Sequence, residues 1–547
     1  MSAGAPTEIP LVDAAGARAG DRAAVEAGTS WEALLARAGG HLARAVVRAG
    51  GGHAYGLKVT LVVGKGDNGG DGWEAASRLA ALGAAPWVVA VHGTDVETSP
   101  HSAAARDRWL RAGGRTSAGT DELSVALAGA DVAVDCLLGT GTEGDPRGVV
   151  AAGVEALLDA HAAGTTVVAC DVPTGVSADD GRVGTPAVVA DLTVTFGTHT
   201  RGLWLHPGSA HVGEVVVGEL GPTYEVPATD ADGRRWRGLT AAGAAPPRYR
   251  SDADKRARGT VLVVGGQLAT PGAAALAGAA ALRAGAGLVT VATPAPPAAI
   301  VGTDPGMMTT ALPADVDGAV AAGAADLLGP RAWDADCVVA GPGLGYGTGA
   351  REVVLRLRAT ARRLVLDADA LNVHRDVPGL LGEHAGELVL TPHAGELARI
   401  GGGSDADDAW ANRVERVPEL AARYRATIVA KGPGTIVAAP DGRVWVTPVA
   451  APALGSGGAG DVLAGIIGAA LASSAGGATR FPGSAVPDLP RTVAQAVWWH
   501  AAAGLVAGRG RADRATAVDV VGALPEALEE LRARAEDDPC WPFGERP

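Results

Sequence analysis

GSGGAGDVLAG, from Gly455 to Gly465, combines a glycine-rich loop with the start of an apolar run. The glycines let the backbone bend and bring several amide groups close to an anion. The alanine-rich run at 462–471 has the length of a helix, and a helix N-terminus that follows such a loop favours phosphate. Asp461 lies at the junction, where a carboxylate can act as a base on a substrate hydroxyl. The alternative is a glycine turn followed by an ordinary capping aspartate.

Length and composition limit the possible classes of protein. A chain of 547 residues is too long for one core, so we expect two large domains. The net charge of −14 argues against a nucleic-acid partner, although a local basic pocket for a nucleotide stays possible. Neither a signal peptide nor a long uninterrupted apolar run is present, which predicts a soluble protein with no membrane partner. The cysteines lack CxxC spacing, which predicts reduced thiols in the cytoplasm; they are Cys136, Cys170, Cys337 and Cys540.

A strand, a glycine loop and a helix follow one another early in the chain. The buried pattern KVTLVV at 58–63 runs into GKGDNGGDG at 64–72, and a helical pattern follows. The loop contains GxGxxG, typical of a dinucleotide-binding turn, but the next strand does not end in an acidic residue. Asp67, Asn68 and Asp71 also give the loop polar side chains that a pyrophosphate turn does not need. We therefore expect a polar site here.

Further strand patterns at 132–138, 166–170 and 192–196 alternate with helical segments, as in a parallel α/β sheet. Asp135 and Asp171 each stand at a strand end, where ligands of such sheets gather. Residues that could meet in one crevice are Asn68, Asp71, Asp135, Asp171 and Thr174. Their oxygens suit a hard monovalent or divalent cation. Each aspartate singly is more often a turn residue, but together they favour a functional site.

The C-terminal half repeats this arrangement of strands and loops. Strand patterns lie at 260–264, 288–292, 337–340, 364–366, 388–390, 427–430 and 444–447. The loops after five of them are GGQLATPGAA, GPGLG (341–345), DADALN (367–372), TPHAGE (391–396) and KGPGT (431–435). His393 alone would be structural and Lys431 alone a solvated charge. The glycines and threonine after Lys431, just before the phosphate loop, favour nucleotide contact instead.

Prolines and charges accumulate where hydrophobic periodicity stops, between Gly221 and Arg258. This composition is typical of a linker. We therefore expect an N-terminal domain at 1–221, a linker at 222–249 and a C-terminal domain at 250–547.

Four motifs, in order, make the N-terminal half resemble the epimerase domain of bifunctional NAD(P)H-hydrate repair enzymes. They are GKGDNGGDG, VDCLLGTGTEGDPRG, DVPTGVSADDG and PGSAHVGEVVVGELG. The resemblance implies a Rossmann-like domain that epimerises 6-hydroxylated NADH and NADPH beside a potassium ion. The implied substrate residues are Asp67, Asn68, Gly69, Gly70, Asp71, Gly139, Thr140, Gly141, Thr142, Glu143, Gly144, Asp145 and Asp171. The implied potassium ligands are Asn68, Asp135 and Thr174.

Two positions depart from the pattern of this family. The family usually has two adjacent asparagines where this chain has Asp67 and Asn68, and a serine in place of Thr174. Threonine keeps the hydroxyl group, so the second change is mild. Asp67 adds a negative charge near a substrate that carries phosphates, which raises the question of how that charge is accommodated.

The C-terminal half, from about 260 to 528, resembles the ribokinase-like dehydratase domain of the same enzymes. The motifs are PGAA, RAGAGLVTVATP, GPGLG, DADALN, TPHAGE and GAGDVLAG, while SDADKRARG departs from the family's usual SHKG. The implied contacts with the hydrated cofactor are Ala273, Gly343 (or its neighbour Gly341), His393 and Asp461. The implied nucleotide contacts are Lys431, Gly432, Pro433, Gly434, Thr435 and Gly460.

Together the two resemblances imply metabolite repair by one α/β chain with two sites. An epimerase would interconvert the R and S hydrates, and a dehydratase would restore NAD(P)H from the S form with ADP or ATP and magnesium. Asp461 would be the base for dehydration and Asp171 the acid and base for epimerisation. We expect only small-molecule ligands and a homo-oligomer. The alternatives are a ribokinase-like vitamin-precursor kinase fused to a binding domain, and an N-terminal domain that only senses its ligand.

Overall fold

The computed structural model describes the chain except for residues 1–5, 302–304, 375–377, 477–487, 512–513 and 538–547. Contacts divide the chain into two compact units, which we treat separately. Ile9–Trp236 form the N-terminal unit. The chain from Arg237 onward forms the C-terminal unit, to which residues 6–8 also belong.

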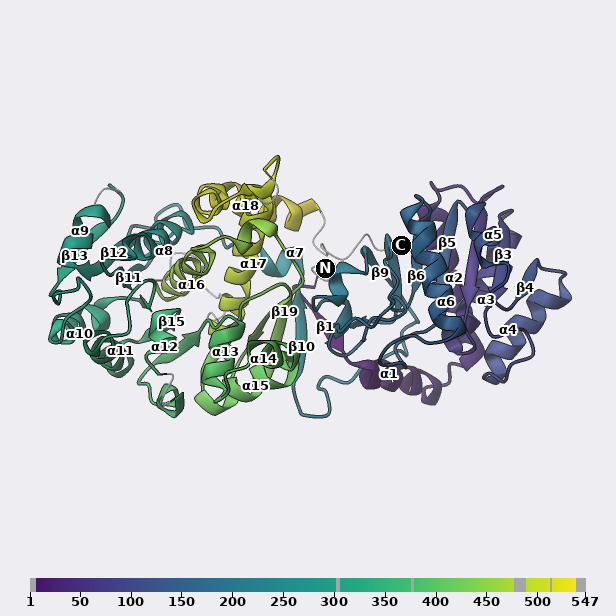
Figure 1. Cartoon of the computed structure of the whole chain (residues 1–547), viewed down its shortest axis with the longest axis horizontal. Helices are drawn as coiled ribbons and strands as arrows, with labels where there is room; N and C mark the ends of the chain where they lie inside the picture. Colours follow the sequence, from purple (N-terminus) through teal and green to yellow (C-terminus); the bar gives the residue numbers. More distant parts are fainter. Residues whose placement is uncertain (1–5, 302–304, 375–377, 477–487, 512–513, 538–547) are drawn as a thin grey trace. The chain divides into compact units, whose positions relative to one another are not determined.

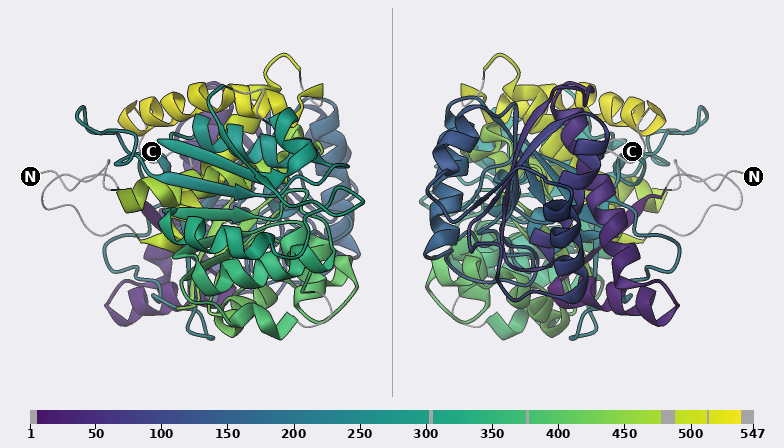
Figure 2. Two further views of the ribbon diagram at one scale, coloured as in Figure 1. Left: turned by 90° about the vertical axis from the view of Figure 1, so that its left-hand side faces the viewer. Right: turned by 90° about the vertical axis from the view of Figure 1, so that its right-hand side faces the viewer.

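The N-terminal unit is a parallel sheet between two layers of helices (Figures 1 and 2). Its strands run in the order β4-β3-β2-β5-β6-β7-β9, and every neighbouring pair is parallel. The strands are β2 (Lys58–Val63), β3 (Ala85–Ala90), β4 (Thr116–Ala118), β5 (Val132–Cys136), β6 (Thr166–Cys170), β7 (Leu192–Phe196) and β9 (Glu214–Gly218). A short parallel pair, β1 (Glu8–Val12) with β8 (His199–Thr200), accompanies the sheet.

The alternation of buried side chains in β2 explains the two helix layers. Leu61 and Val63 point to one face, which α2, α3 and α4 cover, while Val62 points to the opposite face under α5 and α6. Both faces are apolar because parallel strands are covered on both sides. The helices are α1 (Ala14–Glu26), α2 (Trp31–Ala49), α3 (Asp67–Ala81), α4 (Pro100–Arg111), α5 (Leu123–Ala128) and α6 (Val149–Ala162).

The C-terminal unit has a larger mixed sheet with the order β13-β12-β11-β14-β15-β16-β17-β18-β19. Pairing is parallel from β13 to β17 and antiparallel from β17 to β19. The strands are β10 (Arg235–Leu239), β11 (Thr260–Val264), β12 (Leu288–Pro294), β13 (Met308–Leu312), β14 (Cys337–Ala340), β15 (Arg363–Leu366), β16 (Glu387–Leu390), β17 (Thr427–Ala430), β18 (Thr435–Ala438) and β19 (Arg443–Thr447).

Helices also cover both sides of this second sheet (Figure 2, left). The yellow-green α16 packs on α8, α17, β11 and β14, and α10 and α11 pack together on the other side. The helices are α7 (Ala241–Ala244), α8 (Pro271–Arg283), α9 (Ala295–Val301), α10 (Ala324–Asp334), α11 (Thr348–Thr360), α12 (Asp369–Asn372), α13 (Ala394–Ile400), α14 (Ala406–Ala411), α15 (Arg413–Tyr424), α16 (Ala459–Gly476), α17 (Leu489–Gly508) and α18 (Ala517–Asp537). None of the described helices combines the length and apolar character that a membrane crossing requires.

The α/β architecture predicted for both halves is confirmed, and several details differ from the expectation. The strand expected at 132–138 ends at Cys136, because the chain turns there to place Leu137 and Leu138 over the sheet edge. The segment expected to be a linker, 222–249, contains β10 and α7. Thr240 caps α7 by accepting a hydrogen bond from the Gly243 amide at 3.2 Å. Cys136, Cys170 and Cys337 are free and buried, and Cys540 lies outside the described residues.

Candidate active sites

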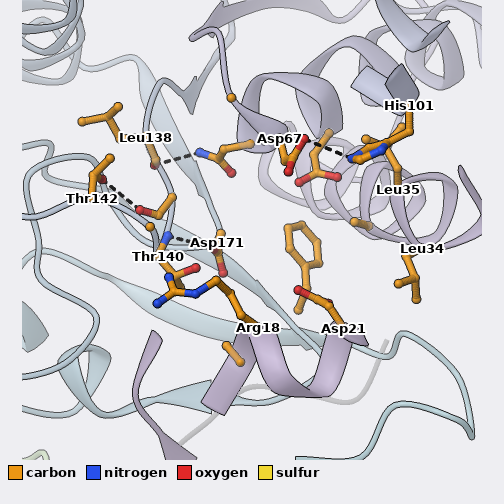
Figure 3. Close-up of a pocket in the computed structure, with 18 of the residues that line it drawn as sticks. Arg18, Asp21, Leu34, Leu35, Asp67, His101, Leu138, Thr140, Thr142 and Asp171 are labelled. Carbon is orange, nitrogen blue, oxygen red and sulfur yellow. Dashed lines mark hydrogen bonds and ion pairs between the residues drawn. The ribbon is translucent and has the colours of Figure 1, made fainter. Parts of the chain in front are cut away.

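A cavity of about 490 Å³ opens at the carboxyl ends of β2, β5 and β6 in the N-terminal unit (Figure 3). Lys65, Leu138 and Asp171 each follow one of these strands and line it. The opposite wall comes from α1 and α2, with the aromatic side chains of Phe196 and Tyr224 between them. A polar pocket therefore lies where the parallel topology predicts a ligand.

The cavity brings together most of the substrate residues implied for this unit. Those that line it are Asp67, Asn68, Asp71, Gly139, Thr140, Gly141, Thr142 and Asp171. Those that do not are Gly69, Gly70, Glu143, Gly144 and Asp145. Gly69 packs under the Gly64 carbonyl, where a Cβ would come within 2.2 Å of the oxygen. Asp145 accepts a hydrogen bond from the Thr185 amide at 2.9 Å and so faces another turn.

Asp171 occupies a strained position at the end of β6. Its φ is +68°, a left-handed conformation that non-glycine residues rarely adopt. Residues in such strained conformations are often found at functional sites. Its Oδ2 accepts a hydrogen bond from the Thr140 amide at 3.1 Å, which fixes the carboxyl group against the 139–142 loop (Figure 3). Burial raises the pKa of Asp171. The group is thus held in place and more readily protonated than an exposed aspartate.

Further carboxyl groups share the cavity with Asp171. Burial raises the pKa of Asp71 well above its usual range, and the charges of Asp171 and Asp67 raise it further. Burial and the charge of Asp171 raise the pKa of Asp21 to about 6. Asp21 and its neighbour Tyr224 were not predicted, because α1 and the segment after β9 carry no motif that connects them with the glycine loops.

The three implied potassium ligands lie together beside the cavity. Thr174 donates from both its hydroxyl and its amide to the carboxyl oxygens of Asp135, each at 2.7 Å. Asn68 Nδ2 donates to the Leu138 carbonyl at 2.8 Å, and the Leu138 amide donates to Thr174 Oγ1 at 3.1 Å. Asn68 Oδ1 is buried and has no hydrogen-bond partner among the described residues. This unpaired oxygen, beside a carboxylate, a hydroxyl and a carbonyl, fits a hard cation.

Asp135 is buried completely, and this burial raises its pKa to about 6, although the hydrogen bonds from Thr174 act in the opposite direction. A cation would favour the ionised form. No cluster of three or more His, Cys, Asp or Glu side chains that could hold a metal occurs in the described parts of the chain. A transition-metal site built from such ligands is therefore absent from those parts.

In the C-terminal unit, Asp461 lies in the first turn of α16, directly after the glycine loop. Burial and the nearby Asp367 raise the pKa of Asp461 to about 7, while Lys431 opposes this rise. Gly460 leaves room for these groups, because a Cβ there would lie 3.3 Å from Lys431 Nζ. A carboxyl group with a pKa near neutrality at a helix N-terminus can exchange a proton with a bound hydroxyl.

Lys431 connects three loops of this site. It forms an ion pair with Asp367, lies 3.8 Å from Glu396, and donates its backbone N–H to the Pro392 carbonyl at 2.9 Å. Burial alone would lower the pKa of Lys431, but the carboxylates of Asp367 and Glu396 raise it, so the ammonium group stays charged. Thr391 donates to Asp367 at 2.7 Å and holds the pair in place.

Asp367 and Glu396 were not predicted as site residues, although both lie in motifs that the sequence indicated. Glu396 is almost completely buried, and burial raises its pKa to about 7. Its carboxylate accepts from the His393 amide at 2.9 Å, and His393 Nδ1 in turn accepts from the Gly395 amide at 3.0 Å. His393 therefore caps α13, but its side chain is still 56% exposed and available to a ligand. The sequence signal for Asp367 was its position directly after β15, and that for Glu396 was the TPHAGE motif between β16 and α13.

The remaining predicted residues of the C-terminal site fall into two groups. Gly343 has φ +60°, and a Cβ there would come within 2.6 Å of the Thr270 carbonyl at the start of α8. It therefore lies close to Ala273 in the first turn of that helix. Gly432, Pro433, Gly434 and Thr435 form a tight turn, in which Thr435 Oγ1 donates to the Gly432 carbonyl at 2.6 Å. This turn directly follows Lys431, and its nucleotide-binding role stays a prediction.

The N-terminal unit thus has carboxyl groups of raised pKa at the strand-end cavity, and the C-terminal unit has Glu396 and Asp461, also of raised pKa, in the first turns of α13 and α16. Together they define a two-site α/β enzyme. The family model for the YjeF-related protein N-terminus matches residues 31–202, and that for NAD(P)H-hydrate dehydratase matches 261–525. The chain belongs to the family of bifunctional NAD(P)H-hydrate repair enzymes, as predicted. The first of these family models matches within the N-terminal unit, and the second matches within the C-terminal unit.

Curated relatives match over nearly their whole length. The bifunctional NAD(P)H-hydrate repair enzyme Nnr of Moorella thermoacetica is 34% identical over 92% of this chain and 93% of its own. The enzyme of the same name from Thermanaerovibrio acidaminovorans is 36% identical over 91% and 94%. The solved ADP/ATP-dependent NAD(P)H-hydrate dehydratase of Bacillus subtilis, co-crystallised with ATP and Mg²⁺, is 28% identical over 53% of this chain and 97% of its own, with a TM-score of 0.44.

Proposed function

We propose that the chain repairs hydrated NADH and NADPH. The N-terminal unit interconverts the R and S hydrates, and the C-terminal unit dehydrates the S form with ADP or ATP. The observation that carries this proposal is the pairing of family membership with two separate acid–base sites, Asp171 in one unit and Asp461 in the other. Two sites on one chain make chemical sense because a dehydratase that fits one epimer would leave the other unrepaired.

Dehydration uses the C-terminal site as a kinase would. Asp461 takes the proton from the ring hydroxyl, whose oxygen attacks the terminal phosphorus of the nucleotide. Amides of the loop at 457–460 stabilise charge on the transferring group. Phosphate is a better leaving group than hydroxide, so its loss from the ring, together with loss of a proton from the adjacent ring carbon, restores the double bond. Lys431 lies beside Asp461 and can contact a nucleotide phosphate, while His393, Ala273 and Gly343 contact the hydrate.

Epimerisation needs an acid and a base beside the hydroxylated carbon. The ring nitrogen expels the hydroxyl, which Asp171 protonates, and an iminium ion results. Water then adds to the other face, and its proton returns to Asp171. The raised pKa of Asp171 supports the protonated state that starts the cycle.

Two metal ions complete the proposal. Potassium would be held by Asn68 Oδ1, Asp135 and Thr174, with the Leu138 carbonyl close by. When bound, it would supply positive charge beside an anionic substrate. Magnesium would accompany the nucleotide in the C-terminal site, where Asp367 and Glu396 are the nearest described carboxylates to Lys431. We further propose a cytoplasmic homo-oligomer; three buried free thiols agree with a reducing compartment.

One assay tests the function. The purified chain is incubated with mixed NADH-hydrate epimers, with and without ADP or ATP, while the absorbance of the reduced ring is followed. We expect complete recovery with nucleotide and none without it. Accumulation of a phosphorylated hydrate would instead indicate a small-molecule kinase. Recovery of only half of a racemic mixture at the enzymatic rate would indicate that the N-terminal unit binds without epimerising.

The assignment of activities to parts of the chain is tested by fragments. We propose that the N-terminal domain expected from the sequence, residues 1–221, catalyses epimerisation. We propose that the C-terminal domain, residues 250–547, catalyses dehydration. Contacts within the chain separate two compact units between Trp236 and Arg237, and residues 6–8 group with the second unit. Fragments cut at both positions, assayed with separated epimers, distinguish the two boundaries.

A further inference from the structure

Asp67, where the family pattern has asparagine, lies in a polar network at the edge of the N-terminal cavity (Figure 3). Its Oδ1 lies 3.0 Å from His101 Nε2 and accepts a hydrogen bond from Ser102 Oγ, also at 3.0 Å. Ser99 donates to the same oxygen. One oxygen of this carboxylate in α3 is therefore contacted by three residues at the start of α4.

His101 is held on both of its sides. Ser99 Oγ lies 2.9 Å from its Nε2, and the indole of Trp31 stacks on the imidazole with the ring centroids 5.6 Å apart and the planes at 12°. The side chain of His101 is only 13% exposed, whereas that of Asp67 is 67% exposed. The histidine is thus the fixed member of the pair, and the carboxylate is the member that an entering ligand meets.

The charge balance of the cavity makes this pair important for an anionic ligand. Asp21, Asp71 and Asp171 also line it, while the lysine and arginine side chains on its wall are Arg18 and Lys65. A dinucleotide carries two or more negative charges into this acid-rich space. An uncompensated Asp67 would oppose its entry, because like charges brought together without solvent repel strongly.

We infer that Asp67 and His101 act as one charge-compensated unit that admits the anionic hydrate to the cavity. This inference rests on the proposed epimerase function. The imidazole Nε2 lies 3.0 Å from the Asp67 carboxylate, and the hydroxyl groups of Ser99 and Ser102 donate to the same oxygen. The charge that aspartate introduces in place of the family's asparagine is therefore shared among three polar groups. Both residues are specificity-determining for binding and take no part in proton transfer to the ring.

The inference predicts an asymmetry between single and double variants. His101→Asn removes the imidazole beside the Asp67 carboxylate, so the KM of epimerisation should rise by about fivefold, the scale of one partly exposed charge interaction, while kcat changes less than twofold. Asp67→Asn removes the charge and should leave KM within about twofold of the parent. Asp67→Asn/His101→Asn should recover most of the KM that His101→Asn loses.

The test uses the full chain and a pure R hydrate of NADH without nucleotide, with formation of the S hydrate followed by chromatography. His161→Asn is the matched control, because His161 lies 3.3 Å from Asp191 in a comparable pair, and neither residue of that pair lines the cavity. Its KM should equal that of the parent. Raised salt should reduce the defect of His101→Asn, because screening weakens the repulsion.

The outcomes separate this inference from the proposed function. If the parent chain forms no S hydrate, the epimerase assignment fails. If the parent is active but the double variant is no better than His101→Asn, the histidine has only a packing role with Trp31, and the inference is overturned. The inference also fails if His101→Asn changes kcat and leaves KM unaltered.

Discussion

The two candidate sites stabilise their carboxyl groups in different ways. In the C-terminal site, the charge of Lys431 lies among Asp367, Glu396 and Asp461. In the N-terminal cavity, Asp71 and Asp171 face each other's charge, and the pKa of Asp71 is raised well above its usual range. The C-terminal site therefore contains a buried lysine charge among its carboxylates, whereas the N-terminal cavity contains buried carboxyl groups of raised pKa.

This difference follows from the chemistry required of each site. Phosphoryl transfer brings several negative charges at once, and a buried lysine provides a fixed positive charge for them. Epimerisation needs a carboxyl group that can both give and take a proton, which like-charged neighbours and burial promote. The same topology, with aspartates after parallel strands, therefore supports two kinds of electrostatics.

The largest expected effect comes from the base of the C-terminal site. Asp461→Asn keeps the size of the side chain but cannot accept the hydroxyl proton, so nucleotide-dependent dehydration should fall by roughly 100-fold or more. Nucleotide binding and epimerisation should be unchanged, because the N-terminal cavity does not involve this residue. Stopped-flow absorbance with pure S hydrate measures dehydration, and calorimetry with ADP measures nucleotide binding. Near-normal dehydration in this variant would remove Asp461 from the mechanism.

The next effect concerns the external cation. Asp135→Ala should slow epimerisation by about tenfold or more and abolish stimulation by potassium, because the ion loses its carboxylate ligand. Dehydration of the S hydrate should stay within twofold of the parent. Potassium should stimulate the parent more than sodium does.

Thr174→Ser provides the control for this variant, since it keeps the hydroxyl group and restores the residue common in the family. Its potassium titration should resemble that of the parent. Coinciding titrations for Asp135→Ala and the parent would make Asp135 a turn residue and remove the potassium site from this unit.

A smaller effect is expected from pH. The pKa of Asp461 is about 7, and the base must be ionised, so dehydration should rise by roughly tenfold between pH 6 and pH 8. The contribution of Asp461 to the free energy of unfolding instead decreases as the pH rises. Because burial raises the pKa above its unfolded value of 3.8, the folded state binds the extra proton, and this contribution is lost as the pH rises through about 7. A flat rate profile from pH 6 to pH 8 would contradict the assignment.

The smallest expected effect tests the assignment of the chain's first residues to the C-terminal unit. Glu8 accepts hydrogen bonds from Trp445 Nε1 at 3.2 Å and Arg491 Nε at 2.9 Å. Glu8→Ala should lower the unfolding free energy of this unit by about 1 kcal/mol, as expected for a partly exposed pair. Denaturation followed by the dehydratase activity measures this, with epimerisation as the unaffected reference. If Glu8→Ala made both activities equally more sensitive to denaturant, the assignment of residues 6–8 to the C-terminal unit would be contradicted.

The sequence predicted those features that depend on local pattern. The strands β2, β6, β7, β11, β14 and β17 have the bounds expected from their short apolar runs. Asp171 and Asp461 were predicted as catalytic residues because each follows such a run or a glycine loop, and these roles stay predictions. In parallel sheets, strand ends meet at one edge, so residues far apart in sequence could be assigned to the same crevice.

Features that depend on tertiary contacts were not predictable from local pattern. Asp21 and Tyr224 reach the cavity from segments with no glycine motif, and the Asp367–Lys431 pair joins loops 64 residues apart. The compensation of Asp67 by His101 depends on how α4 packs beside α3, which hydrophobic periodicity does not specify. The strand β10, with the polar sequence RWRGL, lies in a segment whose prolines and charges favoured a linker.

The contacts of Glu8 have a consequence for synthesis on the ribosome. Arg491 is made 483 residues after Glu8, so at about 5–20 residues per second the first residues wait roughly half a minute or more for this partner. During that interval the N-terminal unit can fold, while the Glu8 carboxylate still lacks Arg491 as its hydrogen-bond donor. An N-terminal tag or a chaperone that holds residues 6–8 would therefore delay completion of the dehydratase unit, whereas Leu11 and Val12 can already pair with β8.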